Sequence, residues 1–290
     1  MTAVECIVRG ADLLGESPIW CPRTGRLFWV DSRAPALHRL EPAGGRVTSV
    51  RLPALIGSIG LREEAGLIAA FQDGLFLLDP DTGERSLLTN PEADRPENRF
   101  NDGRVDRQGR FWAGTMNDRR RDPTGALYRL DPDRRVTRIR GEVIVPNSLA
   151  WSPDSRVMYF ADTYRYRIWS YDFAAEAGLP SGERIFADTS GGPGRPDGSA
   201  VDEAGCLWNA EYAGARLVRY TPAGAVDRVV PLPVSNPTCC AFGGPGLETL
   251  FVTSARQRLS PEQLEREPLA GGLFALRVGV RGLPEPRFLG

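Results

Sequence analysis

Residues 100–115 decide the fold: they read FNDGRVDRQGRFWAGT. A short strand-like segment is followed by a polar turn that contains Gly109, and then by a second strand-like segment rich in aromatic residues. Five other stretches have the same order of strand, polar turn and more hydrophobic strand. They begin at Leu14, Ile56, Pro146, Pro196 and Pro237. The chain therefore contains six copies of one unit.

Each copy continues into a third strand-like element that ends in a turn, such as LFLLDPDTG from Leu75. The copies recur at intervals of roughly 40 to 50 residues, which is the length of a four-stranded propeller blade. Six such blades fill residues 1–290 as one domain. The sequence therefore predicts an all-β, six-bladed β-propeller. A seven-bladed ring and a β-sandwich are the alternatives, and neither fits a sixfold repeat of this length.

The two ends of the chain indicate how the ring closes. The last copy lacks a fourth strand after residues 273–277, whereas residues 3–8 form a strand-like segment ahead of the first copy. We expect this N-terminal strand to complete the sixth blade, because closure in this way removes an exposed sheet edge. The best helix signal is at residues 260–266, about two turns in a connection.

Composition excludes several classes of function. The net charge is −1 with 25% charged residues, so no large basic field points to nucleic acid. No apolar run approaches the roughly 18 residues that a membrane span needs. Residues 1–11 lack the apolar core of a signal peptide. We therefore expect a soluble, cytoplasmic protein that acts on a small molecule, with a monomer as the default state.

The residues available for catalysis are restricted. The chain contains no lysine, which rules out a Schiff-base enzyme and a phosphate-loop lysine. His38 is the one histidine, and its strand-like surroundings favour a structural role. Five cysteines without a CxxC pair indicate reduced, buried thiols. Acid–base chemistry is therefore expected from carboxylates, a metal ion or water, and a metal site is expected to use oxygen ligands.

The repeat also predicts a ring of polar side chains. The innermost strand of each propeller blade runs along the central channel, so the residue that enters it lies at one mouth of the channel. This position holds Glu16, Ser58, Asn101, Asn147, Asp197 and Thr238. Such oxygen ligands suit a hard divalent cation, with Ca²⁺, Mg²⁺ or Mn²⁺ favoured by ligand type. The alternative is a hydrated polar channel with no bound ion.

The same segments resemble the gluconolactonase family, also called the regucalcin or senescence-marker-protein family. The matching pieces lie between residues 14 and 256 and read LGESPIW, RFNDGRVDRQGRFWAGTM, PNSLAWSPD, PDGSAVD and FGGPGLETLFVTSAR. The resemblance implies a six-bladed propeller that uses one divalent metal ion to hydrolyse sugar-acid lactones, for example glucono-, xylono- or arabinonolactone. Ca²⁺ is the favoured ion, and Zn²⁺, Mn²⁺ and Fe²⁺ are alternatives.

The resemblance also implies roles for individual residues. Glu16, Asn147 and Asp197 correspond to the metal ligands, and Asp197 is also the expected general base. Arg99 and Asn101 correspond to a pair that contacts substrate. On this basis we expect Asp197 to orient or deprotonate the attacking water, and Arg99 and Asn101 to donate hydrogen bonds to sugar hydroxyls or to the developing oxyanion.

The chain departs from the family pattern at two places. Many relatives have glycine where this chain has Ser17 and Ser148, a small change beside the expected ligands. Some relatives place an acidic, substrate-contacting residue after the GTM motif, where this chain has NDRRR at residues 117–121. Charge runs are usually solvated loops, and we interpret Arg119–Arg121 in this way. A preference for an anionic lactone is the alternative.

Two other functions are compatible with the same pattern. A second metal-dependent esterase, acting on phosphotriesters or other acyl lactones, would use the same fold, because fold does not determine substrate. A calcium-binding propeller without catalytic activity would use the same ligands. A pure scaffold is disfavoured, because it needs no polar ring at the strand entries.

Overall fold

The turn inside the repeat at residues 100–115 is held by a polar side chain of its own. In residues 100–115, Asp106 Oδ1 accepts hydrogen bonds from the backbone N–H groups of Gln108 and Arg110, each at 3.0 Å. Gly109 follows with a φ of 77°, a left-handed conformation that glycine adopts without steric cost. The turn reverses the chain, so that β10 (Asn98–Val105) pairs with β11 (Phe111–Asn117) as an antiparallel hairpin.

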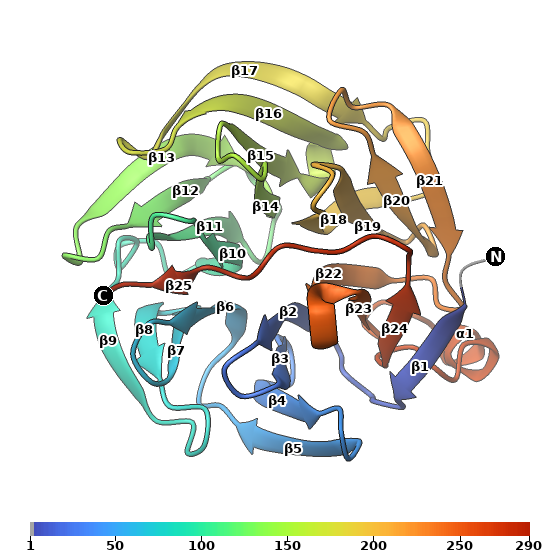
Figure 1. The fold of residues 1–290 in the computed structure, drawn as a ribbon. Helices are drawn as coiled ribbons and strands as arrows, with labels where there is room; N and C mark the ends of the chain where they lie inside the picture. The colour runs from blue at the N-terminus through green and yellow to red at the C-terminus, as the bar shows by residue number, and fades with distance from the viewer. Residues whose placement is uncertain (1–2) are drawn as a thin grey trace.

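The computed structural model describes residues 3–290, and it confirms the six-bladed β-propeller. Six antiparallel blades surround a central axis (Figure 1). Blade 1 contains β2 (Gly15–Cys21), β3 (Arg26–Asp31), β4 (Ala36–Glu41) and β5 (Arg46–Arg51). Blade 2 contains β6 (Ile56–Arg62), β7 (Leu67–Phe71), β8 (Gly74–Leu78) and β9 (Arg85–Thr89). Blade 3 continues from β10 and β11 to β12 (Gly125–Leu130) and β13 (Val136–Val143).

The remaining blades follow in chain order around the ring. Blade 4 contains β14 (Pro146–Trp151), β15 (Val157–Asp162), β16 (Arg167–Ala174) and β17 (Leu179–Asp188). Blade 5 contains β18 (Arg195–Val201), β19 (Leu207–Tyr212), β20 (Arg216–Tyr220) and β21 (Val226–Pro231). Blade 6 contains β22 (Pro237–Gly243), β23 (Thr249–Ser254) and β24 (Leu273–Arg277), and a strand from the other end of the chain completes it.

That strand is β1 (Val4–Val8), which pairs antiparallel with β24 and confirms the expected closure. Blade 6 therefore joins the N-terminal strand to the last repeat, as Figure 1 shows where β1 and β24 lie side by side. The predicted helix is also present as α1 (Pro261–Arg266), in the connection between β23 and β24. Ser260 caps it, because its hydroxyl accepts a hydrogen bond from Gln263 N–H at 3.3 Å.

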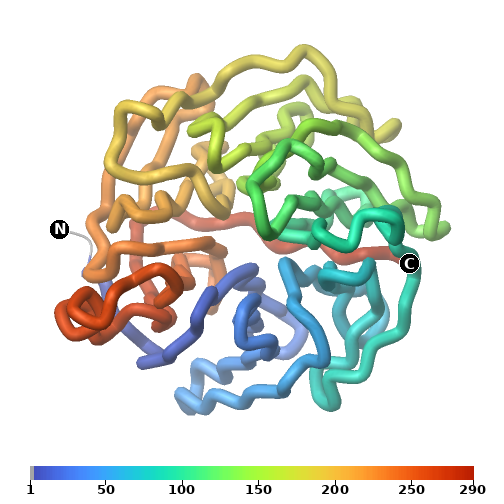
Figure 2. Tube along the Cα trace, turned by 180° about the vertical axis from the view of Figure 1, so that it is seen from behind, coloured from blue at the N-terminus to red at the C-terminus, as the bar shows by residue number. Residues whose placement is uncertain are grey.

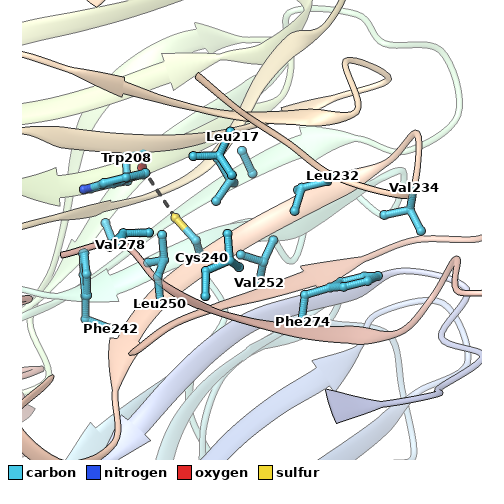
Figure 3. Close-up of a cluster of buried hydrophobic side chains, with 14 of the residues drawn as sticks. Trp208, Leu217, Leu232, Val234, Cys240, Phe242, Leu250, Val252, Phe274 and Val278 are labelled. Carbon is cyan, nitrogen blue, oxygen red and sulfur yellow. Dashed lines mark hydrogen bonds between the residues drawn. The ribbon is translucent and has the colours of Figure 1, made fainter. Parts of the chain in front are cut away.

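Aromatic and aliphatic side chains fill the spaces between the blades. Figure 3 shows one such cluster around Cys240, whose thiol donates to the carbonyl oxygen of Trp208 at 3.5 Å. Trp112 and Trp208 are fully buried. Their indole N–H groups donate to Asp106 and Asp202 at 2.8 and 2.9 Å. The two tryptophans therefore stabilise the blades and do not line the channel.

The C-terminal segment crosses the ring, which the repeat did not predict. It runs over the middle of the molecule on the side that faces the viewer in Figure 1, and it lies behind the blades in Figure 2. Its last strand, β25 (Arg287–Phe288), pairs parallel with β6 of blade 2. Glu285 pairs with Arg104, with Nε to Oε2 at 3.1 Å and Nη2 to Oε1 at 2.5 Å. No helix among residues 3–290 has both the length and the apolar character to span a bilayer.

Candidate active site

The innermost strands share a bulge at the position where the polar ring was predicted. In blade 4, Asn147 pairs with Ala161, but Ala150 pairs with Tyr159, so β14 has one residue more than its partner. The same shift follows Glu16 in β2 and Pro196 in β18. A β-bulge bends a strand and redirects its side chains. The bulges therefore occur at the residues that are expected to face the channel.

Four of the six predicted ring residues line one cavity at this mouth of the channel. They are Glu16, Asn101, Asn147 and Asp197, and Arg99 lines the same cavity. The cavity encloses about 490 Å³, part of it open to solvent. The structure therefore brings together all the side chains that the sequence assigned to metal and substrate. The innermost strands run from this cavity to the crossing C-terminal segment, where Arg104, Ala150 and Ala200 lie close to Glu285.

The other two ring residues, Ser58 and Thr238, do not line the cavity. Ser58 is fully buried, and the Thr238 hydroxyl donates to the carbonyl oxygen of Gly15 at 2.5 Å. Gly57 explains the position of Ser58, because a Cβ at Gly57 would lie 2.3 Å from the carbonyl oxygen of Asn101. The entry of blade 2 therefore packs directly on blade 3 and leaves no space for a side chain in the channel.

The floor of the cavity is acidic. Burial, and then the negative charge of Asp102, raise the pKa of Glu16 to about 8. Burial and the charges of Glu16 and Asp102 raise the pKa of Asp197 as well. Within residues 3–290, no arginine forms an ion pair with Glu16, Asp102 or Asp197. Buried carboxylates without a positive partner are costly, so this floor is suited to a cation.

Asp102 is the acidic residue that sequence reasoning missed. Burial raises the pKa of its carboxyl group, and its Oδ2 accepts a hydrogen bond from Leu149 N–H at 3.0 Å. It follows Asn101 directly, and its charge raises the pKa of both Glu16 and Asp197. The bulge in β10 between Phe100 and Gly103 contains both residues, and the repeat alignment singled out only the strand-entry position, which Asn101 occupies.

The amide of Asn147 is oriented by Thr163, which sequence reasoning also missed. Asn147 Nδ2 donates to Thr163 Oγ1 at 2.7 Å, and the Thr163 hydroxyl donates to the carbonyl oxygen of Pro196 at 2.8 Å. These hydrogen bonds fix the amide nitrogen in the protein, and Asn147 Oδ1, which accepts from Asn101 Nδ2 at 3.4 Å, is the atom left for a cation. A carbonyl oxygen beside two carboxylates is a donor set that a hard divalent cation accepts. The described residues hold no group of three His, Cys, Asp or Glu side chains arranged for a metal.

Asn101 and Arg99 are held by their neighbours. Asn101 Oδ1 accepts from Arg99 Nη1 at 3.0 Å, and Asn101 Nδ2 donates to the carbonyl oxygen of Pro146 at 3.0 Å. Arg99 Nε donates to Asp118 Oδ1 at 2.7 Å. Asp118 also binds Arg33, and these two arginines outweigh the effect of burial and hold the pKa of Asp118 well below its usual range. Asp118 therefore positions Arg99 at the edge of the cavity.

Tyr164 and Tyr212 also line the cavity, together with three arginines besides Arg33 and Arg99. The arginines are Arg121, Arg195 and Arg258, which come from three separate segments. Of the run Arg119–Arg121, only Arg121 faces this cavity, and Arg120 is exposed. Arg195 and Arg258 were not predicted, because they stand outside the six aligned copies.

The thiols and the histidine take no part in the cavity. All five cysteines are free, and burial raises the pKa of Cys239 well above its usual range, so this thiol stays protonated. His38 lies on β4, where Nδ1 is 2.7 Å from Ser49 Oγ and Nε2 is 3.3 Å from Asp12 Oδ1. The side chains available for acid–base chemistry in the cavity are therefore carboxylates.

Comparison with known proteins agrees with this geometry. The family model described as the SMP-30/Gluconolactonase/LRE-like region matches residues 14–256. The chain belongs to this family. Its sequence is 43% identical over 290 residues to 6-deoxy-6-sulfogluconolactonase of Pseudomonas putida, with 99% of each chain covered. It is 34% identical over 294 residues to regucalcin of Xenopus laevis, with 99% of this chain and 98% of the relative covered.

A solved structure of a related protein has the same fold as this chain. The crystal structure of a calcium-binding protein, regucalcin, from Agrobacterium tumefaciens matches with a TM-score of 0.95 and 34% sequence identity. The match covers 99% of this chain and 97% of that protein. The family resemblance predicted from the motifs is therefore confirmed.

Proposed function

We propose that this member of the gluconolactonase family uses a divalent cation to hydrolyse sugar-acid lactones to the free acids. The observation that carries the proposal is the floor of the cavity, where Glu16 and Asp197 are buried carboxylates without an arginine partner. Asn147 adds an oriented amide oxygen to them. A small polar ring fits a cavity of about 490 Å³ that is open on one side.

Glu16, Asn147 and Asp197 would hold the cation. The raised pKa values of Glu16 and Asp197 support this assignment, because a cation removes the repulsion that raises the pKa of both carboxyl groups. The oxygen ligands suit a hard divalent ion, and Ca²⁺ is favoured because the Agrobacterium relative is described as a calcium-binding protein. When bound, a divalent cation supplies positive charge that polarises the lactone carbonyl.

Asp197 acts as the general base in this proposal. Its carboxylate accepts a proton from water, the water oxygen bonds to the carbonyl carbon, and the bond between that carbon and the ring oxygen breaks. The proton then passes to the ring oxygen, so the products are a carboxylic acid and a hydroxyl group. Burial and nearby carboxylates raise the pKa of Asp197 in the metal-free protein, and a bound cation would lower it, so that the carboxylate is ionised and able to accept the proton.

Arg99 and Asn101 position the sugar. Arg99 Nε and Nη1 are engaged with Asp118, Phe100 and Asn101, whereas Nη2 has no hydrogen-bond partner among the described residues. Since Arg99 lines the cavity, this N–H group is available to a sugar hydroxyl or to the developing oxyanion. Its orientation is set before substrate binds, which reduces the entropy lost on binding.

A gluconate-type lactone is the substrate that the relatives support most directly. The Pseudomonas relative is named as a lactonase for 6-deoxy-6-sulfogluconolactone. Glucono-, xylono- and arabinonolactone are the neutral substrates to test beside it. The five free cysteines agree with a reducing, cytoplasmic setting for this reaction.

The test is lactone hydrolysis followed with a pH indicator, corrected for spontaneous opening. The protein is stripped with a chelator and then supplied with Ca²⁺, Mn²⁺, Zn²⁺ or Fe²⁺ singly. We expect turnover only with metal, and we expect Asp197→Asn to lose at least about a hundredfold in kcat. Asp94→Asn is the matched control, because Asp94 is exposed and lies outside the cavity.

Three results would redirect the assignment. Full activity of Asp197→Asn would remove Asp197 as the general base. Metal binding without turnover on any lactone would support the calcium-binding propeller, and turnover on aryl esters or phosphotriesters alone would support the other esterase.

A further inference from the structure

One wall of the cavity carries arginines that no carboxylate neutralises. Arg121, Arg195 and Arg258 line the cavity, and none of them forms an ion pair with an Asp or Glu among residues 3–290. Arg33 and Arg99 in the same cavity behave differently, because they share Asp118. The wall therefore has a surplus of positive charge that the protein itself does not balance.

The three arginines meet at Tyr164. The guanidinium carbon of Arg195 lies 4.8 Å from the centre of the Tyr164 ring, and that of Arg121 lies 5.4 Å from it. Arg258 Nη1 donates to the Tyr164 hydroxyl at 3.0 Å. Tyr164 thus holds three like charges together, although their repulsion opposes this arrangement.

These side chains come from separate segments of the chain. Arg121 follows β11 in blade 3, Tyr164 lies in the turn after β15 in blade 4, and Arg195 begins β18 in blade 5. Arg258 lies between β23 and α1 in blade 6. Arg121 and Arg258 have left-handed backbone, with φ of 61° and 65°. Strained backbone at residues that converge on one point is typical of a binding site.

The cavity has two electrostatic poles. Burial alone would raise the pKa of Tyr164, but Arg258, Arg121 and Arg195 outweigh it and lower that pKa. Burial and the charge of Asp197 raise the pKa of Tyr212 in the same cavity to about 12. A ligand that spans the cavity therefore meets an acidic floor at one end and a basic wall at the other.

We propose that Arg121, Arg195 and Arg258 bind an anionic substituent of the lactone, while its ring lies at the acidic floor. The inference rests on the proposed function and adds a substrate class to it. Sulfonate, phosphate and carboxylate groups share the required chemistry, because each accepts several hydrogen bonds from guanidinium groups. A neutral sugar would leave the three positive charges without a counterion.

The position of the basic wall fits a substituent that is distant from the carbonyl. Tyr164 follows Thr163, which orients the amide of Asn147, and Arg195 precedes Asp197 by two residues on β18. The basic wall and the proposed metal ligands are thus connected through the same short segments. Residues two apart on a strand are separated by roughly 7 Å, a distance that a lactone of five or six carbons can span.

The experiment compares gluconolactones that differ only at carbon 6, which carries a hydroxyl, a carboxylate, a sulfonate or a phosphate. For each we would measure kcat and KM with metal-loaded wild-type protein. We expect kcat/KM to be roughly ten- to a hundredfold higher for at least one anionic lactone than for the neutral one, which is the usual effect of hydrogen bonds to a charged group. The order among the three anions identifies the substituent.

Variants assign the effect to the arginines. We expect Arg121→Gln and Arg258→Gln each to lower the ratio of anionic to neutral kcat/KM by roughly tenfold, mainly through KM. Arg121→Lys keeps the charge and should retain an intermediate ratio. Arg120→Gln is the matched control, because Arg120 is exposed in the same loop and does not line the cavity.

Each outcome decides the inference separately from the proposed function. Equal kcat/KM for neutral and anionic lactones, or an equal loss on both in Arg121→Gln, would overturn the basic wall as an anion site while the lactonase stands. If no lactone is hydrolysed, the affinities of the protein for 6-sulfogluconate and gluconate, measured by calorimetry, test whether the basic wall binds an anionic substituent. Tighter binding of the sulfonated acid that Arg121→Gln abolishes would support the inference, and equal binding would overturn it.

Discussion

The carboxyl groups of Glu16, Asp102 and Asp197 lie in one region of the protein. Among residues 3–290, no arginine forms an ion pair with any of the three. Arg99 and Arg104 are close enough to lower the pKa values of these acids, yet each is bound to another carboxylate, Asp118 or Glu285. A divalent cation would balance two of the three charges. The metal-free protein is therefore expected to be destabilised by its own site.

The first consequence is a pH dependence of stability. Glu16 has a pKa of about 8 in the folded protein, against an ordinary value of 4.5. Between these pH values the unfolded chain releases a proton that the folded chain keeps, so the metal-free protein loses stability as pH rises. The slope is about 1.4 kcal/mol per pH unit for each such proton. Thermal denaturation of chelated protein between about pH 5 and about pH 8 measures it.

Added Ca²⁺ should flatten this profile, because the cation compensates the charge of Glu16 and Asp197. The double variant Glu16→Gln, Asp197→Asn should flatten it without metal, with Asp102, Arg99 and Cys239 left as the charged or titratable neighbours. An identical slope in the wild type and the double variant would show that these acids do not produce the effect.

At the scale of the strand, the bulge connects the site to the neighbouring blade. Ser148 follows Asn147 with a left-handed φ of 58°, a conformation that favours glycine. Its hydroxyl donates to the carbonyl oxygen of Asp197 at 2.5 Å and accepts from Asn209 Nδ2 at 3.0 Å. Ser17 makes the corresponding link to blade 2, since its Oγ accepts from Ile59 N–H at 3.0 Å. At both positions, serine therefore adopts a backbone conformation that favours glycine and forms a hydrogen bond between blades.

We expect Ser148→Ala to destabilise the protein by about 2 kcal/mol, because it removes these hydrogen bonds and keeps the unfavourable φ. Ser148→Gly should cost about 1 kcal/mol less, because glycine adopts this φ without a steric penalty. Urea denaturation of metal-free protein measures both. The same two substitutions at Ser155 are the matched control. Ser155 also has a φ of 58°, but it lies in a turn, where its Oγ accepts a hydrogen bond from Arg107. Equal stability of the two Ser148 variants would contradict the strain argument.

The repeat was sufficient to predict what recurs in every blade. It placed Glu16, Asn101, Asn147 and Asp197 at one mouth of the channel because these residues occupy equivalent strand positions. It was wrong about Ser58 and Thr238, whose side chains are buried between blades. The repeat did not predict Thr163, Arg195 and Arg258, because they do not occupy equivalent strand positions. They lie in connections or strand ends that differ from blade to blade, and only the folded ring brings them together.

At the scale of the molecule, both ends of the chain tie distant blades together. β1 completes blade 6, which follows from the missing fourth strand in the last repeat. The crossing of residues 283–288 to blade 2 was not predictable, because a two-residue strand has no periodicity. Arg104 anchors this segment, since it binds Glu285 and also donates to the carbonyl oxygen of Ser199 in blade 5.

We expect Glu285→Gln to destabilise the protein by about 3–5 kcal/mol, because it leaves the guanidinium of Arg104 buried without a full counter-charge. Replacing both partners, as in Arg104→Met with Glu285→Leu, should cost less than the single change. Thermal denaturation compares them. The control is Glu63→Gln, because the pair of Arg23 and Glu63 is about half exposed and is worth at most about 1 kcal/mol. Equal losses in Glu285→Gln and Glu63→Gln would show that the C-terminal segment is not anchored by this pair.

The C-terminal segment has a consequence for substrate entry and product release. It lies across the far side of the ring, where its Glu285 pairs with Arg104, whereas the cavity that contains Glu16 and Asp197 opens beside Arg121, Arg195 and Arg258. A lactone that enters through this opening, and the acid product that leaves through it, both pass the basic wall. The acid product carries one negative charge more than the lactone, so it leaves against the attraction of Arg121, Arg195 and Arg258. For the lactonase proposed here, the departing product would compete with the next substrate, and the reaction would slow itself as it proceeds.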